Sequence, residues 1–186
     1  MAFGISGVFF NEDGKQQEFG YPYSERKTRI AAMPNNSIKL IRIYQHGAPG
    51  YIGDDDANAL AQMLKDKMQK NGQIQLLGCS TAGVEGHAWN PVGGIGLLTR
   101  MIMYHGVMKM MGLPEAAKKW SDNVAGDTSR LIPNVFVMGL SGISFPLSRI
   151  HDSLETGFKP SALMADRFVY MNGKLLSEYS NFNLPK

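Results

Sequence analysis

The chain has 186 residues, of which 44% are hydrophobic and 19% charged, and its formal net charge is +3 at pH 7. These values exclude a disordered chain and predict one globular domain, residues 1–186, whose core needs no disulfide or metal. The single cysteine excludes an internal disulfide and a cysteine-based zinc cluster, so no metal site is expected.

The first predicted elements are a hairpin and a buried strand. Residues 5–20 predict a β-hairpin, because Asp13 and Gly14 suit a turn between two arms rich in β-prone residues. Residues 37–45 form a short run rich in isoleucine, interrupted mainly by Arg42. Such a run is typical of a strand that is covered on both faces.

The next predicted element is an amphipathic helix over residues 54–72. Aspartates stand where they can cap its N-terminus, and Gly72 is suited to end it. Its apolar face comprises Ala57, Leu60, Ala61, Leu64 and Met68. Residues 74–78 then predict a second buried strand, so this strand-helix-strand unit should contain two parallel strands joined by a crossover.

Two more helices, a strand and a hairpin complete the predicted domain. Helices are expected at residues 90–112 and 114–124, each with a proline in its first turn. Residues 134–140 predict a third buried strand, and residues 167–180 predict a hairpin around an Asn-Gly turn. The alternation of strands and helices implies an α/β fold with a core within about residues 37–145.

A histidine and the single cysteine follow the two strands of the strand-helix-strand unit. His46 comes directly after the first strand, and Cys79 directly after the second. Catalytic groups and ligands of open parallel sheets collect beyond the carboxyl ends of the strands. Because neighbouring strands lie about 4.8 Å apart, the two side chains can converge on one cleft.

This pair fits nucleophilic catalysis by a thiol. A nearby imidazole stabilises a thiolate and can protonate the leaving group. Gly47 and the glycines around Cys79 allow close approach of a peptide, and backbone N–H groups there suit a developing oxyanion. A lone cysteine after an apolar strand is also typical of core packing, and a strand-end histidine often bonds only a backbone carbonyl. The residues alone leave both interpretations open.

The sequence has no common export or membrane signal, and its basic residues are scattered. Residues 1–17 lack the basic start, apolar stretch and cleavage site of a secretory signal. The longest apolar run, residues 92–98, is far shorter than the ~20 residues of a membrane helix. We therefore expect a protein that is cytoplasmic as synthesised, with neither a membrane nor a nucleic-acid partner. Secretion into a host cell would need a route without a cleaved signal.

The segments YQHGAPG, residues 44–50, and LLGCSTAG, residues 76–83, resemble the motifs of the caspase-like clan of cysteine proteases. This clan includes caspases, clostripain, gingipains and the autoprocessing domains of large bacterial toxins, to which the chain is most similar. The resemblance covers about residues 37–145. It implies a three-layer α/β/α sandwich with a mostly parallel central sheet and peripheral β-hairpins.

The resemblance implies a cysteine endopeptidase that cleaves a protein or peptide substrate, in the manner of a bacterial effector or toxin. His46 is then the catalytic acid and base, Cys79 the nucleophile, and the N–H groups of Gly47 and Cys79 the oxyanion hole. The substrate-binding residues expected from the clan are Ser141, Gly142 and Ser144. No cofactor is required for this chemistry.

The toxin domains are activated by inositol hexakisphosphate, so the resemblance also implies a host-cell activator of this kind. The basic residues that suit such a ligand are Arg26, Lys27, Arg29, Lys118, Lys119 and Arg130. A solvated surface explains these scattered residues equally well.

Two functions outside proteolysis stay open at this point. One is a catalytically inactive caspase-like module that binds a peptide or a partner protein at the same sheet edge. The other is a flavodoxin-like binder of a small ligand, with the loops after the two strands in contact with a phosphate. Thiol reactivity separates the first from a protease, and a copurifying nucleotide or flavin would indicate the second.

Overall fold

The computed structural model of the chain describes residues 4–48, 50–78, 81–82, 123–143 and 164–177. The strands of its main sheet are β1 (Gly4–Phe10), β2 (Gln16–Pro22), β3 (Ile38–Tyr44), β6 (Met68–Leu76), β7 (Phe136–Ile143), β8 (Met164–Met171) and β9 (Lys174–Ser177). A small second sheet contains β4 (Gly47–Ala48) and β5 (Tyr51–Ile52). The described helices are the 3-10 helix η1 (Tyr23–Glu25) and the α-helices α1 (Arg26–Ala31), α2 (Ala57–Leu64) and α4 (Val124–Leu131). These elements confirm the α/β class.

The main sheet is mixed, with strand order β2-β1-β3-β6-β7-β8-β9. The central pairs β3–β6 and β6–β7 are parallel, whereas the four outer pairs of described strands are antiparallel. The expectation of a mostly parallel sheet is therefore wrong. Both predicted hairpins form, but they continue the central sheet on its two sides, where they supply backbone partners for β3 and β7.

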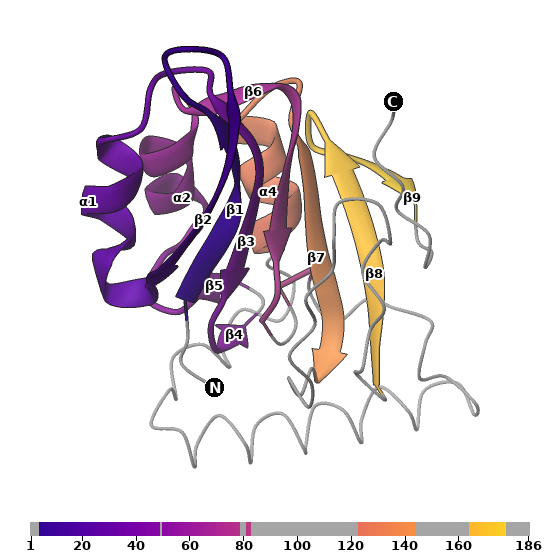
Figure 1. Cartoon of the computed structure of the whole chain (residues 1–186). Helices are drawn as coiled ribbons and strands as arrows, with labels where there is room; N and C mark the ends of the chain where they lie inside the picture. The colour runs from indigo at the N-terminus through magenta and orange to yellow at the C-terminus, as the bar shows by residue number, and fades with distance from the viewer. Residues whose placement is uncertain (1–3, 49, 79–80, 83–122, 144–163, 178–186) are drawn as a thin grey trace, which may run out of the picture.

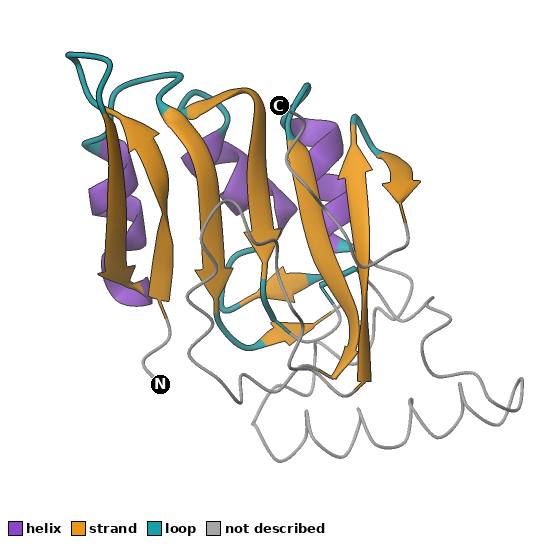
Figure 2. Cartoon of the chain, turned by 45° about the vertical axis from the view of Figure 1, so that its right-hand side comes forward, coloured by secondary structure: helices purple, strands orange, loops and turns teal. Residues whose placement is uncertain are grey.

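The described helices form a single layer. Figure 1 and Figure 2 show α1, α2 and α4 against the same face of the main sheet. The predicted helix at residues 90–112, and most of that at residues 114–124, lie outside the described residues, so the third layer stays a prediction. α4 was not predicted, and it begins where the second of these helices was expected to end. The side chain of Asn123 caps α4 by accepting a hydrogen bond from the N–H of Gly126 at 2.9 Å.

The predicted helix at residues 54–72 is shorter in the structure, and the next strand begins earlier. As expected, an aspartate caps α2: the side chain of Asp56 accepts from the N–H of Ala59 at 2.8 Å. However, α2 ends at Leu64 and β6 begins at Met68. The side chain of Met68 is buried as predicted, but it belongs to a strand and not to the helix. The carbonyl of Lys67 accepts hydrogen bonds from two N–H groups at the start of β3, at 2.9 and 3.0 Å. These bonds to a distant segment replace the helical bonds that the local pattern favours.

The core lies between the helices and the sheet. Ile41, Ile43, Ile74 and Leu76 are completely buried, in one apolar cluster with the inner face of α2. In β7, Val137 and Leu140 are completely buried as well, so all three strands predicted to be buried are confirmed. No helix in the described part of the chain has the length and hydropathy to cross a membrane.

Four asparagines with positive φ angles lie in turns or irregular strand segments at the end of the sheet where the parallel strands begin. They are Asn36, Asn71, Asn134 and Asn172, with φ between 52° and 61°. The N–H of Asn71 donates to the carbonyl of Asn134 at 2.7 Å, and the N–H of Asn134 donates to Oδ1 of Asn172 at 2.8 Å. Asparagine tolerates this left-handed backbone better than most residues. The first bond joins β6 to the turn before β7, and the second joins that turn to the turn between β8 and β9.

Gly7 on β1 allows a test of the packing of the N-terminal hairpin. A methyl group at Gly7 would overlap the carbonyl oxygen of Leu40 and lie 2.9 Å from the ring of Phe19. We expect Gly7→Ala to lower the free energy of unfolding by about 1–3 kcal/mol, as overpacking does, when measured by urea denaturation. Gly20→Ala on β2 is the matched control, because its methyl group meets nothing within 4 Å. Equal losses in the two variants would contradict this packing.

Candidate active site

The exits of β3 and β6 define the candidate site. The two strands are parallel, as predicted, and they are adjacent in the sheet. From Leu40 to Ile43 each residue of β3 pairs with the residue 33 positions later in the chain, as Ile43 does with Leu76. The N–H of Leu77 donates to the carbonyl of Ile43 at 2.9 Å and extends this pairing beyond the last strand residues. His46 and Cys79 are also 33 positions apart. The two strands therefore end side by side, at the edge of the sheet where His46 and Cys79 were predicted to lie.

The backbones remain in contact beyond the strands. A Cβ atom on the buried Gly78 would lie 2.7 Å from the carbonyl oxygen of Gln45 and 2.9 Å from Cα of Gly47. The residue before Cys79 is thus packed against the residues on both sides of His46. Cys79 itself lies outside the described residues.

The chain is anchored again immediately after the predicted nucleophile. The side chain of Thr81 is completely buried, and its hydroxyl lies 3.0 Å from the carbonyl of Leu76 and 3.3 Å from that of Gly78. The same oxygen accepts a hydrogen bond from the N–H of Leu140 on β7 at 2.9 Å. The N–H of Ala82 returns a bond to the carbonyl of Leu140 at 2.9 Å. Nothing in the run of small residues around Cys79 indicates this role of Thr81 from the sequence.

Two of the predicted substrate-binding residues lie on the next strand. Ser141 and Gly142 belong to the carboxyl-terminal part of β7, where they pair with β8. β7 runs parallel to β6, so this part of β7 lies at the same sheet edge as the exits of β3 and β6. Their side chains, and Ser144 as a whole, lie outside what the structure describes.

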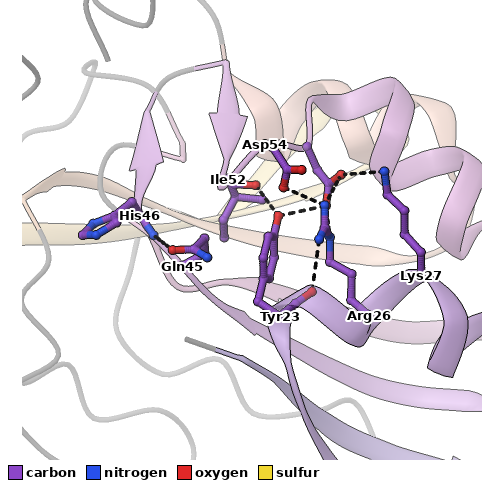
Figure 3. Close-up of polar contacts among 8 residues, drawn as sticks. Tyr23, Arg26, Lys27, Gln45, His46, Ile52 and Asp54 are labelled. Atoms are coloured by element: carbon purple, nitrogen blue, oxygen red, sulfur yellow. Dashed lines mark hydrogen bonds and ion pairs between the residues drawn. The ribbon is translucent and has the colours of Figure 1, made fainter. Parts of the chain in front are cut away.

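The backbone of His46 is held on both sides while its side chain is exposed. Its N–H donates to Oε1 of Gln45 at 2.9 Å, and its carbonyl accepts from the N–H of Gly53 at 2.7 Å. In Figure 3 the imidazole ring points away from Tyr23 and Arg26. Gly47, the predicted oxyanion residue, is buried and begins the two-residue strand β4.

A buried polar cluster braces the turn that follows His46. Tyr23 directs its hydroxyl at the carbonyl of Ile52, 2.7 Å away, and at Oδ2 of Asp55, 2.8 Å away (Figure 3). The guanidinium of Arg26 binds both carboxylate oxygens of Asp55 and reaches Oδ1 of Asp54 at 2.6 Å. Tyr23, Arg26 and Asp55 are 7%, 5% and 1% exposed, so these three residues are shielded from water, whereas the side chain of Asp54 is exposed. It joins η1 and α1 to a turn about 30 residues later.

Three residues of this cluster, Tyr23, Arg26 and Asp54, have shifted pKa values. Burial, followed by the hydrogen bond to Asp55, raises the pKa of Tyr23 far above its usual value, so the phenol stays a donor. Burial lowers the pKa of Arg26, but the hydrogen bond to Asp55 and nearby charges raise it more. Burial raises the pKa of Asp54, but the bond to Arg26 and nearby groups lower it more. The guanidinium of Arg26 therefore stays charged near neutral pH, and so does the carboxylate of Asp54 that it binds.

The basic residues considered for a phosphate activator are paired with carboxylates where the structure describes them. The pairs are Arg26–Asp55, Lys27–Asp55, Arg29–Glu25 and Arg130–Asp127. Arg26 is buried, and α2 separates α1 from α4 in Figure 1. Lys118 and Lys119 lie outside the described residues. Among the described residues, no group of three or more histidine, cysteine or acidic side chains is arranged to hold a metal ion.

Comparisons with known proteins returned no match to a family model, a curated protein or a solved structure. The residues at the sheet edge and their geometry are therefore the basis for the function proposed below.

Thr81 allows a test of how firmly the predicted nucleophile's loop is attached. Thr81→Val keeps the shape of the side chain but leaves the buried N–H of Leu140 without its acceptor. We expect a loss of about 1–3 kcal/mol in the free energy of unfolding, measured in urea. Thr81→Ser keeps the hydroxyl and should lose less, about one buried methyl group, or ~0.8 kcal/mol. A Thr81→Val variant as stable as the parent would contradict the anchoring role.

Proposed function

We propose that the chain is a cysteine endopeptidase of the caspase-like type, with His46 and Cys79 as its catalytic dyad. The observation that carries the proposal is the constant register of the parallel strands β3 and β6 from Leu40 to Ile43. If that register continues for three more residues beyond Leu76, Cys79 stands opposite His46. The contact of Gly78 with Gly47 supports this continuation. The proposal includes the second helical layer of a three-layer sandwich.

The proposed reaction uses the thiolate of Cys79 as nucleophile. His46 stabilises the thiolate, which attacks the carbonyl carbon of the scissile peptide bond. The N–H groups of Gly47 and Cys79 stabilise the oxyanion that forms. His46 then protonates the leaving amine, and later accepts a proton from the water that hydrolyses the thioester. The exposed ring of His46 supports this role, because substrate and water must both reach it.

The proposed substrate is a protein or peptide that lies along the carboxyl end of β7. Ser141, Gly142 and Ser144 are the proposed contacts, because β7 reaches the same sheet edge. We further propose an effector or toxin role inside a host cell, with inositol hexakisphosphate or another host factor as activator. Secretion without a cleaved signal is part of this proposal.

The first test measures the reactivity of the thiol. If His46 stabilises the thiolate, Cys79 should react with iodoacetamide at pH 6.5 much faster than a free cysteine with a pKa of about 8.5. The His46→Ala variant should react more slowly, because its thiolate fraction is smaller. Slow and equal rates in the two proteins would instead indicate the catalytically inactive module.

The second test measures cleavage. Cys79→Ala should abolish peptide-bond cleavage at a stability loss within the ~0.5–3 kcal/mol of ordinary substitutions. Cys79→Ser should be almost as inactive, because a hydroxyl needs stronger base assistance than a thiol. The assay follows cleavage of the chain itself and of host-cell extract proteins, with and without inositol hexakisphosphate. Wild-type cleavage by Cys79→Ser would overturn the proposal, and a copurifying flavin or nucleotide would favour the ligand-binding alternative.

A further inference from the structure

We infer that Tyr23, held in place by Arg26 and Asp55, is a positioning residue for His46 and acts through the turn at residues 51–55. The inference deepens the proposed function and rests on it, because the placement of His46 matters for catalysis only if His46 acts on Cys79. The cluster lies outside the dyad, and none of its members was assigned a catalytic role above.

The link begins at the carbonyl of His46. His46 stands two residues beyond the end of β3 and directly before β4, which pairs with β5 through Gly47 and Ile52. The N–H of Gly53 donates to its carbonyl at 2.7 Å. The peptide group that follows the histidine therefore takes its orientation from the turn that contains Gly53.

Gly53 is in turn packed directly on Tyr23. Its φ of 62° is in the left-handed region, and an added Cβ atom would lie 2.5 Å from the hydroxyl of Tyr23 and 2.7 Å from Cγ of Gln45. Only glycine fits this position without strain. The main chain at Gly53 is thus enclosed between Tyr23 and the side chain of Gln45, which also accepts from the N–H of His46.

The hydroxyl of Tyr23 also fixes the residue before Gly53. The carbonyl of the completely buried Ile52 accepts from Tyr23 at 2.7 Å and from the N–H of Asp55 at 3.1 Å. The N–H of Ile52 donates to the carbonyl of Asp55 at 2.9 Å. The backbone bonds between Ile52 and Asp55, together with the nearby hydroxyl of Tyr23, hold the turn in place, which is what a fixed histidine requires.

Buried ionic groups are not needed for stability as such. Replacing a buried ion pair with well-packed apolar residues is often neutral or stabilising, whereas removing one partner leaves an uncompensated charge. A bidentate guanidinium does, however, impose a fixed direction on the carboxylate that it binds. Arg26 thereby orients Asp55, and Asp55 orients the hydroxyl of Tyr23.

The test uses Tyr23→Phe, which removes only the hydroxyl and leaves the Arg26–Asp55 pair intact. Arg26→Ala is unsuitable, because the buried Asp55 would lose the guanidinium that binds both of its carboxylate oxygens. In the full-length variant, we expect amide hydrogen exchange at Gly53 to become roughly tenfold faster as one hydrogen bond to the turn is lost. The His46 ring resonances, identified among the four histidines by their loss in His46→Ala, should shift. Alkylation of Cys79 at pH 6.5 should slow about threefold or more.

Two controls separate positioning from general destabilisation. The amide of Leu77, bonded to Ile43 at the end of the sheet pairing, should exchange at the parental rate in Tyr23→Phe. Tyr21→Phe removes the same hydroxyl group from β2 and should leave all three readouts unchanged. Equal acceleration at Gly53 and Leu77, or an unchanged His46 resonance, would overturn the inference.

The same measurements separate this inference from the proposed protease. Slow alkylation that is insensitive to His46→Ala would overturn the protease, while a shifted His46 resonance and a selective effect at Gly53 would still support positioning. Fast, His46-dependent alkylation that Tyr23→Phe leaves unchanged would overturn positioning and support the protease.

Discussion

The parallel pairing of β3 with β6 is the constraint on which the rest of the described structure depends. Parallel strands need a long crossover, and here that crossover carries α2 and the turn that holds His46. Two parallel strands also end at the same edge, so whatever follows them is brought together by the sheet. The antiparallel hairpins on either side extend the sheet and leave this arrangement unchanged.

Two kinds of interaction act on that edge. Apolar burial fixes the strands, as the completely buried Ile43 and Leu76 show, but it is not directional and stops at the strand ends. Beyond the strands, hydrogen bonds hold the chain. Tyr23 and Gly53 bond to the segment that follows β3, and Thr81 bonds to β7 in the segment that follows β6. The loops that carry the proposed dyad are therefore held by directional contacts to distant parts of the chain.

The local sequence pattern predicts most of the central elements. Three features each have a short-range cause, and each was predicted: the isoleucine-rich run of β3, the apolar face of α2 and the Asn-Gly turn between β8 and β9. The sheet edge at which β3 and β6 both end was predicted as well, because parallel strands run in the same direction. The mixed character of the sheet was not, since no local pattern shows which strand a hairpin will join.

The errors have a common physical origin in contacts over long sequence distances. α2 was predicted too long because its apolar period continues to Met68, whereas the carbonyl of Lys67 is taken by β3. Arg26 was considered as a ligand for a phosphate, and arginine is usually exposed. In the structure Arg26 is buried and its guanidinium binds Asp55. The role of Thr81 cannot be predicted from the stretch of small residues around it, because it depends on three hydrogen-bond partners that only the fold brings together.

The turns with left-handed asparagines make the two ends of the sheet unequal. The chain enters β6 and β7 through short connections, and backbone bonds at Asn71 and Asn134 tie these connections together. It leaves the same strands through the longer segments at residues 77–123 and 144–163. Insertions in the turns that lead into β6 and β7 would break bonds that several turns share. Insertions in the segments that follow these strands would leave those bonds intact. Diversification of this scaffold, in evolution or in a designed library, is thereby directed to the edge that carries the proposed chemistry.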